Sequence, residues 1–244
     1  MLALASRECK FRSVVSRPRE PYPRRVTSSV VSTRETILVV ARQRFAERGF
    51  SGTSLNDIAE EVGIRTPSLF HHFPSKLALY RAVLLDAFDD WFELMDQTTN
   101  QGHSSLPGEQ SEGWPQVERV VRTAFRFFVE RPDFVRLARW EALEGGTVLV
   151  EELATVLRPL FERGVRFLEQ EMDAGRIRRC DARRLVITGY GAVLSYLSDA
   201  PLVGSLLGED PLAPAALATE QEHVLGLFRH ALVPWDADGL PISR

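Results

Sequence analysis

The sequence predicts an all-α protein in which an N-terminal three-helix unit ending in a helix-turn-helix is joined to a larger helical bundle. Three observations lead to this expectation. Apolar residues recur at helical spacing along most of the chain, and the period-two alternation of half-buried strands is nowhere sustained. Capping residues, prolines and glycines stand where these periodic segments begin and end. Finally, 244 residues, 44% of them hydrophobic, can bury a sizeable core.

The segment 1–31 is expected to be a basic, Pro/Arg-rich disordered arm. Its stretch "SRPREPYPRR" is dense in proline and arginine, so fixed φ angles and charge repulsion oppose regular structure. The net charge is +5 over residues 1–31, +1 over residues 32–80 and −9 over residues 81–244. This distribution suits an anion-binding front end on an acidic body, and it equally suits a solvated tail. Translation that begins near residues 26–31 is an alternative.

Cysteine usage and hydropathy lead us to expect a cytoplasmic protein. Cys9 and Cys180 lie far apart and form no CxxC-type pair, which argues against a disulfide framework or a structural zinc site. No apolar run approaches the ~18–20 residues that cross a bilayer. Arg7, Glu8 and Lys10 interrupt any secretory h-region. We therefore expect neither a membrane span nor a secretory signal.

The N-terminal domain is expected to span residues 32–77 and to begin with a capped helix. Its first residues, "STRE", match a capping box with Ser32 as N-cap and Glu35 at the N3 position. Gly49 supplies a stop for this helix. A second helix is then expected over about residues 54–61.

A third helix is predicted over residues 67–73, with Thr66 as its N-cap and Pro67 at N1, where the missing N–H costs nothing. Ser75 is expected to cap a long fourth helix that leads out of the domain. The side chains expected to face inward from the third helix are Leu69, Phe70 and Phe73.

Residues 78–244 are expected to form a second, all-helical domain. The Gly/Ser/Thr/Asn/Gln-rich stretch 98–113 is predicted as a loop, and "SDAPLVGSLLGEDP" (198–211) as a break between the last two helices. Helical periodicity marks the segments 115–130, 133–144, 147–174, 181–198 and 214–232.

The second and third helices have the spacing of a helix-turn-helix. Ala59 is small enough to let the two helices approach, and Gly63, four residues later, tolerates the positive φ of a tight turn. Apolar residues stand where the third helix must lock onto the second. They are Ile58, Val62, Ile64 and Leu69.

The run 37–84 resembles the DNA-binding domain of the TetR family of transcriptional regulators. The residues that carry the resemblance are "FAERGFSGTS", "DIAEEVGI" and "LFHHFPSK". The helical remainder is similar in length and helix order to the ligand-binding and dimerisation body of that family, a likeness at the level of the fold. The resemblance implies a DNA-binding regulator, associated with the nucleoid.

His71 and His72, inside "LFHHFPSK", could also suggest a metal site or a catalytic pair. Adjacent helical residues point about 100° apart, whereas two histidines on one metal ion favour i,i+4 spacing. No nucleophile elbow or GxGxxG motif accompanies the pair. We therefore expect no metal, no cofactor and no catalytic residue.

The outward residues of the third helix have side chains that can read DNA. Arg65 can reach guanine O6 and N7 or a phosphate, and Thr66 and Ser68 can bond base edges. By the resemblance, base contacts fall in "RTPS" and at Asn56, and phosphate contacts at Thr53 or Ser54, His72 and Lys76. The residues expected at DNA are Thr53, Ser54, Asn56, Arg65, Thr66, Pro67, Ser68, His71, His72 and Lys76.

Lys76, which belongs to this set, and Phe70, which does not, both have distinctive side chains for this surface. Lys76 is one of only two lysines in the chain, and its ammonium beside the start of the fourth helix suits a phosphate, although an ordinary solvated charge is the alternative. Phe70 stands where the family very often has a tyrosine whose hydroxyl meets the DNA backbone. That donor is therefore absent, or His71 or His72 replaces it.

The body is expected to form a homodimer that binds a palindromic operator. By the resemblance, segments 181–198 and 214–232 form the dimer interface; their apolar residues could instead close the monomer core. A mostly apolar pocket would suit a hydrophobic effector, but aromatic side chains at helical spacing are also ordinary core. The candidate pocket residues are Phe125, Phe128, Trp140, Phe161, Phe167 and Tyr190.

The expected function is that of a repressor released from its operator when a small hydrophobic molecule shifts the dimer between two conformations. An activator of the same fold would have the same sequence features. Two other classes remain open on the residues alone: a helical enzyme that uses the histidine pair, and a protein-interaction module.

Overall fold

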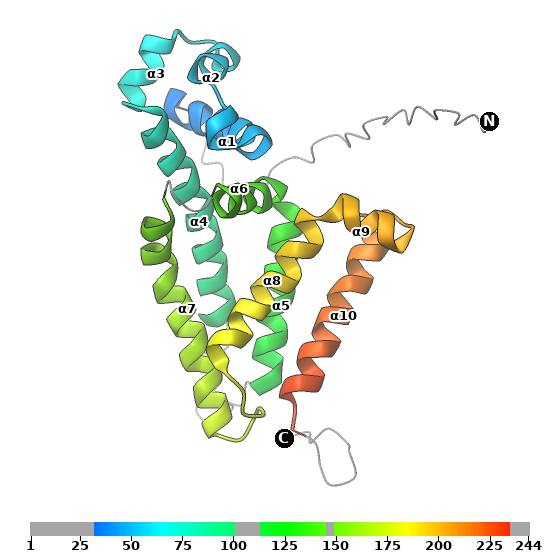
Figure 1. Ribbon diagram of the computed structural model, residues 1–244. Helices are drawn as coiled ribbons and strands as arrows, with labels where there is room; N and C mark the ends of the chain where they lie inside the picture. Colours follow the sequence, from blue (N-terminus) through cyan, green and yellow to red (C-terminus); the bar gives the residue numbers. More distant parts are fainter. Residues whose placement is uncertain (1–31, 101–112, 145–148, 235–244) are drawn as a thin grey trace, which may run out of the picture.

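The structure is a computed structural model that describes residues 32–100, 113–144 and 149–234. In these ranges the chain forms ten α-helices and no strand, which confirms the all-α prediction (Figure 1). The expected arm lies outside the described residues, as does most of the expected loop 98–113. The helices are α1 (Thr33–Gly52), α2 (Leu55–Val62), α3 (Thr66–His72), α4 (Lys76–Asn100), α5 (Gly113–Glu130), α6 (Pro132–Leu143), α7 (Val150–Asp173), α8 (Ala182–Ser198), α9 (Ala200–Leu207) and α10 (Pro214–Leu232).

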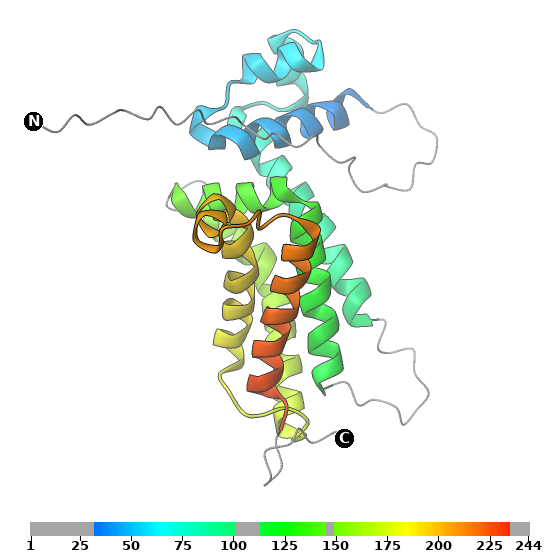
Figure 2. The ribbon, with the colours of Figure 1, turned by 90° about the vertical axis from the view of Figure 1, so that its right-hand side faces the viewer.

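The first three helices form a unit at one end of the molecule, and α4 runs from it along the body (Figures 1 and 2). In the body, α5, α7, α8 and α10 run lengthwise, whereas α6 lies across the end that faces α1 (Figure 1). α6 contacts α1, α5 and α8, so it connects the three-helix unit with the rest of the body. None of the helices in the described ranges is long and apolar enough to cross a membrane.

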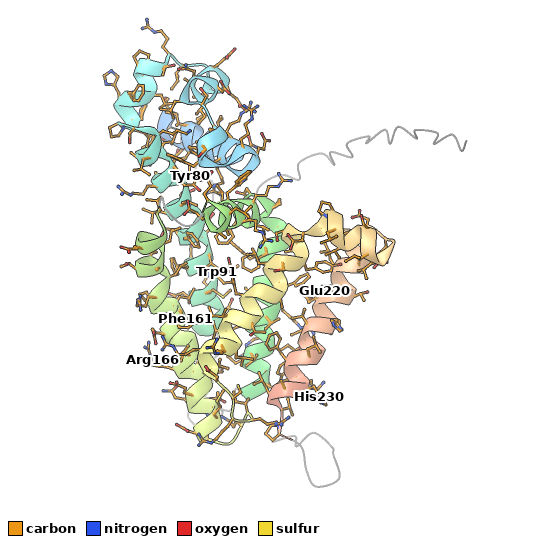
Figure 3. The ribbon with its side chains drawn as sticks, viewed as in Figure 1. Tyr80, Trp91, Phe161, Arg166, Glu220 and His230 are labelled. Carbon is orange, nitrogen blue, oxygen red and sulfur yellow. The ribbon has the colours of Figure 1, made fainter. Side chains whose placement is uncertain are left out.

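Two sets of buried side chains hold the described helices together. The larger set runs from the three-helix unit into the near half of the body, and the smaller one lies in the far half around Val165, Leu168 and Met172. Tyr80 of α4 is fully buried in the larger set and lies where the unit meets the body (Figure 3). The three-helix unit therefore shares a continuous apolar core with the body.

Local sequence signals explain most helix ends. Ser32 and Glu35 form the predicted capping box, in which the Ser32 Oγ accepts from the Glu35 N–H and the Glu35 carboxylate accepts from the Ser32 N–H. Ser75 caps α4, since its Oγ accepts from the Ala78 N–H at 3.1 Å. Gly49 has a φ of 69° and kinks α1 at the predicted stop.

Three details of the sequence prediction are wrong. The N-cap of α3 is Arg65 rather than Thr66, because the Thr66 hydroxyl donates to Asn56 instead of accepting from a helix N–H. Phe70 does not face inward, since 45% of it is exposed. The segment taken as a break forms α9, with Pro201 in its first turn and the αL residue Gly208 after its end.

Candidate DNA-binding surface

The turn between α2 and α3 depends on one glycine. Gly63 caps α2 in the left-handed region, with φ 79° and ψ 27°, and its N–H bonds the Glu60 carbonyl at 3.0 Å. The Ile64 N–H reaches back to the Ala59 carbonyl at 2.9 Å. These bonds satisfy carbonyls that the end of α2 would otherwise leave without donors, and they direct α3 away from α2.

Buried apolar side chains fix α3 on the unit. Leu69 is fully buried, and it belongs to the same cluster as Ile58 and Ala59 of α2. Phe73, directly after α3, is also buried, and the Arg34 guanidinium lies 5.0 Å from its ring centroid. α3 is therefore held by one face, and its other face is available to solvent.

The exposed face of α3 carries most of the residues predicted to contact DNA. Arg65 is exposed and forms no ion pair with any residue that the structure describes. Thr66 and Ser68 are half-buried. The exposed members of the predicted set are Asn56, Arg65, Pro67, His71 and His72.

Asn56 joins α2 to the start of α3. Its Oδ1 accepts a hydrogen bond from the Thr66 Oγ1 at 2.9 Å. The neighbouring Ser54 acts as the N-cap of α2, with its Oγ accepting from the Asn56 N–H at 3.2 Å. The two helices thus present a single connected polar edge.

Thr53 is the one predicted contact that the fold turns inward. It is only 4% exposed, and its Oγ1 donates to the carbonyls of Gly49 (2.7 Å) and Arg44 (3.1 Å). A phosphate contact from this side chain does not fit such burial. Its role is to close the end of α1, and the neighbouring Ser54 keeps the more accessible hydroxyl.

Lys76 lies at the first position of α4 and is only partly solvated. Its Nζ sits 4.7 Å from the centroid of the Phe50 ring and donates to the Ser51 carbonyl at 3.4 Å. The ammonium is therefore held beside the α1–α2 connection, and remaining donors of the group are available to a phosphate.

Ion pairs within the unit neutralise acids of α2. Glu61 accepts from Arg44 at 2.5 Å, and Asp57 accepts from Arg48 at 3.1 Å. Both pairs join α2 to α1. They reduce the repulsion that these carboxylates would exert on a polyanion near α3.

α6 contacts the unit through the side chain of Trp140. Its Nε1 donates to the Ala46 carbonyl at 3.2 Å, and its ring packs against Gly49 at the α1 kink. Glu144, just after α6, accepts from the Ser51 N–H at 3.4 Å. The connection that leads into α2 is thus held by the body.

A partly buried charge cluster adds a second junction between the unit and the body. Arg42 of α1 pairs with Asp86 and Asp90 of α4 and with Asp133 of α6. Arg131, which precedes α6, pairs with Asp90 at 2.6 Å and with Asp133 at 3.5 Å. One helix of the unit is thereby tied to two helices of the body.

Tyr80 and Glu141 place two polar groups inside this junction. Glu141 is 6% exposed, and neither its carboxylate oxygens nor the Tyr80 hydroxyl has a well-formed hydrogen bond within the described residues. Burial raises the pKa of Tyr80 strongly, and the adjacent Glu141 carboxylate raises that pKa further. Tyr80 therefore stays neutral at physiological pH.

The predicted pocket residues separate into different surroundings. Phe128 of α5 and Tyr190 of α8 come together, with ring centroids 6.3 Å apart, and Phe125 is buried in the same large cluster as Phe128. Trp140 instead contacts α1. Phe161 of α7 (Figure 3) and Phe167 belong to the far cluster. The Arg183 guanidinium lies 5.1 Å from the Phe161 ring centroid.

Sequence reasoning missed the aromatic group in which Phe128 sits. Trp91 of α4 stacks on Phe128 at 5.2 Å, and Phe88, Phe127 and Phe134 join it through edge-on contacts. This group connects α4, α5 and α6. The signal was present in the sequence as "FRFF" and in the helical spacing of Phe88 and Trp91.

The segments predicted to form the dimer interface contribute to both core and surface. Val193 and Leu194 of α8 and Val224, Leu225 and Phe228 of α10 are buried within the monomer. Other apolar side chains of this region are exposed. They are Ile187, Tyr190, Leu202, Leu206, Leu207, Leu212 and Leu227.

A helix-turn-helix with one buried and one exposed face, mounted on a larger helical body, defines the class of helix-turn-helix DNA-binding proteins. Comparison with known families agrees with this class. The family profile described as "Bacterial regulatory proteins, tetR family" matches residues 37–83, and "Tetracyclin repressor-like, C-terminal domain" matches residues 115–227. The chain therefore belongs to the TetR family of transcriptional regulators.

Proteins similar in sequence to this chain are HTH-type transcriptional regulators or repressors. The chain is 27% identical over 180 residues to the HTH-type transcriptional regulator RutR of Escherichia coli strain K12. This match covers 74% of this chain and 81% of RutR. It is also 41% identical over 81 residues to the HTH-type transcriptional repressor KstR2 of Mycobacterium tuberculosis strain H37Rv. This match covers 31% of this chain and 40% of KstR2.

Solved structures agree in fold. A putative transcriptional regulator, SCO4942 from Streptomyces coelicolor, aligns with a TM-score of 0.63 at 19% identity and covers 82% of this chain and 98% of its own. AibR in complex with isovaleryl coenzyme A and operator DNA aligns with a TM-score of 0.62 at 16% identity, covering 80% of this chain and 97% of its own.

Proposed function

We propose that the protein is a cytoplasmic, homodimeric repressor whose two α3 helices enter successive major grooves of a palindromic operator. The exposed face of α3 carries this proposal, because a short helix held by one buried face presents Arg65 and its neighbours to solvent at the end of the molecule (Figure 1). In this proposal residues 32–77 are the DNA-binding domain and residues 78–244 the ligand-binding and dimerisation domain.

The proposed base contacts come from the edge formed by α2 and α3. Arg65 donates to guanine O6 and N7, and Asn56, Thr66 and Ser68 bond other base edges, while Pro67 touches a thymine methyl. The proposed phosphate contacts flank this edge. They come from Ser54, His71 or His72, and Lys76, with the N-terminal amides of α4 beside Lys76.

The proposed dimer interface is the side of the body formed by α8 and α10. Their buried residues fix both helices to the core, while Ile187, Tyr190 and Leu227 remain exposed, an unfavourable arrangement for a lone protomer. A two-fold axis beside these helices would cover the same patch on both copies and relate the two α3 helices to a palindrome.

The proposed effector is a small, mostly apolar molecule bound in the body near Phe128 and Tyr190. Phe128 stacks on Phe134 of α6 and contacts Tyr190, and α6 in turn contacts α1, α5 and α8. An effector that binds better to a body conformation with a displaced α6 would change the position of the DNA-binding unit through Trp140 and Arg42. AibR, which shares the fold, is described in complex with both an acyl coenzyme A and operator DNA.

An electrophoretic mobility shift with the DNA upstream of the protein's own gene tests the proposal, together with sedimentation of the protein alone. We expect a dimer that shifts the specific fragment at concentrations where an unrelated fragment of equal length stays free. Affinity should fall steeply with salt, as phosphate contacts require. A monomer, or equal affinity for both fragments, would overturn the proposal.

A further inference from the structure

The hydrogen bond between Thr66 and Asn56 fixes which hydrogen-bonding groups each side chain offers to DNA. The Thr66 Oγ1 donates to the Asn56 Oδ1 at 2.9 Å. A threonine hydroxyl has one proton and two lone pairs, so a hydroxyl that has already donated can only accept. Asn56, whose Oδ1 is engaged, keeps both amide protons as donors.

The polarity of this pair has a consequence in the major groove. Adenine and cytosine present amino groups there, at N6 and N4, whereas guanine O6 and thymine O4 are acceptors. An acceptor-only hydroxyl can receive a hydrogen bond from an amino group but has no proton for O6, O4 or a phosphate oxygen. While the hydrogen bond to Asn56 is kept, the Thr66 hydroxyl at the start of α3 can therefore meet a base edge only as an acceptor.

We propose that Thr66 is a specificity-determining residue that Asn56 holds as a hydrogen-bond acceptor, so that it selects adenine or cytosine at one position of each operator half-site. This inference rests on the proposed function, because it assumes that α3 enters the major groove. Asn56 itself directs its amide donors to a phosphate oxygen or a purine N7. The pair therefore reads DNA as one unit with a set polarity.

Selection from a randomised duplex library tests the inference with the full-length protein and three variants. Thr66→Val keeps the shape and one methyl but removes the hydroxyl, whereas Thr66→Ser keeps the hydroxyl and removes the methyl. Asn56→Ala frees the Thr66 proton. Thermal unfolding of each variant beforehand shows whether it is folded.

The parent and Thr66→Ser should both enrich adenine or cytosine at the same position of each half-site. In Thr66→Val the enrichment of adenine or cytosine at that position should fall by about fivefold, the effect of one lost hydrogen bond. The rest of the motif should be unchanged. Asn56→Ala should admit guanine and thymine at that position, because the hydroxyl can then rotate and donate.

Two results would overturn the inference while leaving the proposed function intact. In the first, Thr66→Val keeps the base preference of the parent and Thr66→Ser loses it, which would assign the contact to the methyl group. The other is an unchanged profile at this position in Asn56→Ala. If the folded parent enriches no motif at all, the proposed function itself is wrong.

Discussion

The indole of Trp140 lies against Gly49 so closely that a Cβ placed on this glycine would be 2.9 Å from the ring atoms Cδ2 and Cε3. Gly49 also has φ 69° and ψ −179°, a backbone conformation that essentially only glycine adopts. One residue therefore serves two purposes: it kinks α1, and it admits the side chain by which α6 contacts the DNA-binding unit.

Gly49→Ala should lower the free energy of unfolding by about 1–3 kcal/mol through backbone strain and by a further ~1–3 kcal/mol through overpacking against Trp140. Gly63→Ala is the matched control, since Gly63 also has positive φ but nothing lies within 4 Å of an added Cβ. It should lose only about 1–2 kcal/mol. Urea unfolding at one protein concentration measures both, and equal losses would contradict the packing role of Trp140.

Arg42→Met should destabilise the protein by about 2–3 kcal/mol, because it leaves Asp86, Asp90 and Asp133 with less cationic charge in a partly buried site. This loss is smaller than that for a fully buried pair, because solvent screens part of the charge. Arg48→Met, on the same helix, removes a pair with Asp57 whose side chains are both 47% exposed. That change should cost less than about 1 kcal/mol. Similar losses in the two variants would show that the Arg42 cluster contributes no more than a surface pair.

Phe70→Tyr should raise DNA affinity. The Phe70 side chain is exposed on α3, and a hydroxyl at its tip would add a donor for the phosphate backbone. One such bond is worth about 1 kcal/mol, or roughly a fivefold lower Kd, for all duplexes alike. Fluorescence anisotropy on specific and unrelated duplexes measures this change, and an unaltered Kd on both would mean that Phe70 does not face the backbone.

The far end of the body should lose stability in acid through Glu171. Burial alone would raise the pKa of Glu171, but hydrogen bonds from Arg176 and from the Gly113 N–H outweigh it and lower the pKa below 4.5. The folded carboxyl thus binds its proton more weakly than the unfolded one. Its stabilisation is present above about pH 4.5 and is lost as the pH falls through the lowered folded pKa.

Glu171→Gln separates this effect from the titration of other carboxylates. Between about pH 6 and pH 3, the parent's free energy of unfolding should fall more than that of the variant. The variant should be less stable at neutral pH, where the charged pair with Arg176 is intact in the parent. Parallel pH profiles would contradict the role assigned to Glu171.

Local signals explain why so much of the fold is predictable from the sequence. The capping box at Ser32, the cap at Ser75 and the αL turn at Gly63 each depend on residues within a few positions of one another. The helix over 200–207 also had such signals, in Pro201 and Gly208. It was missed because a short apolar segment between a proline and a glycine resembles a loop when periodicity is the guide.

The candidate site is less predictable, because side-chain direction depends on contacts between helices. Phe70 was expected inside, yet Leu69 and Phe73 already fill the space that α3 can bury. Thr53 was expected outside, but its hydroxyl is turned inward and donates to the Gly49 carbonyl at the end of α1. Trp140 was grouped with pocket residues. Its contact with Ala46 could not be predicted, because the two residues lie 94 positions apart in the sequence.

The proposed function requires that the exposed face of α3 reads DNA sequence. The most direct test is the ratio of the dissociation constants for an unrelated duplex and for the selected operator, at one salt concentration. We predict a ratio of about 10³ or more. Arg65→Ala should reduce this ratio about tenfold. Lys76→Ala should instead raise both dissociation constants by the same factor and leave the ratio unchanged. A ratio near one for the parent, or one that Arg65→Ala leaves unchanged, would contradict the claim.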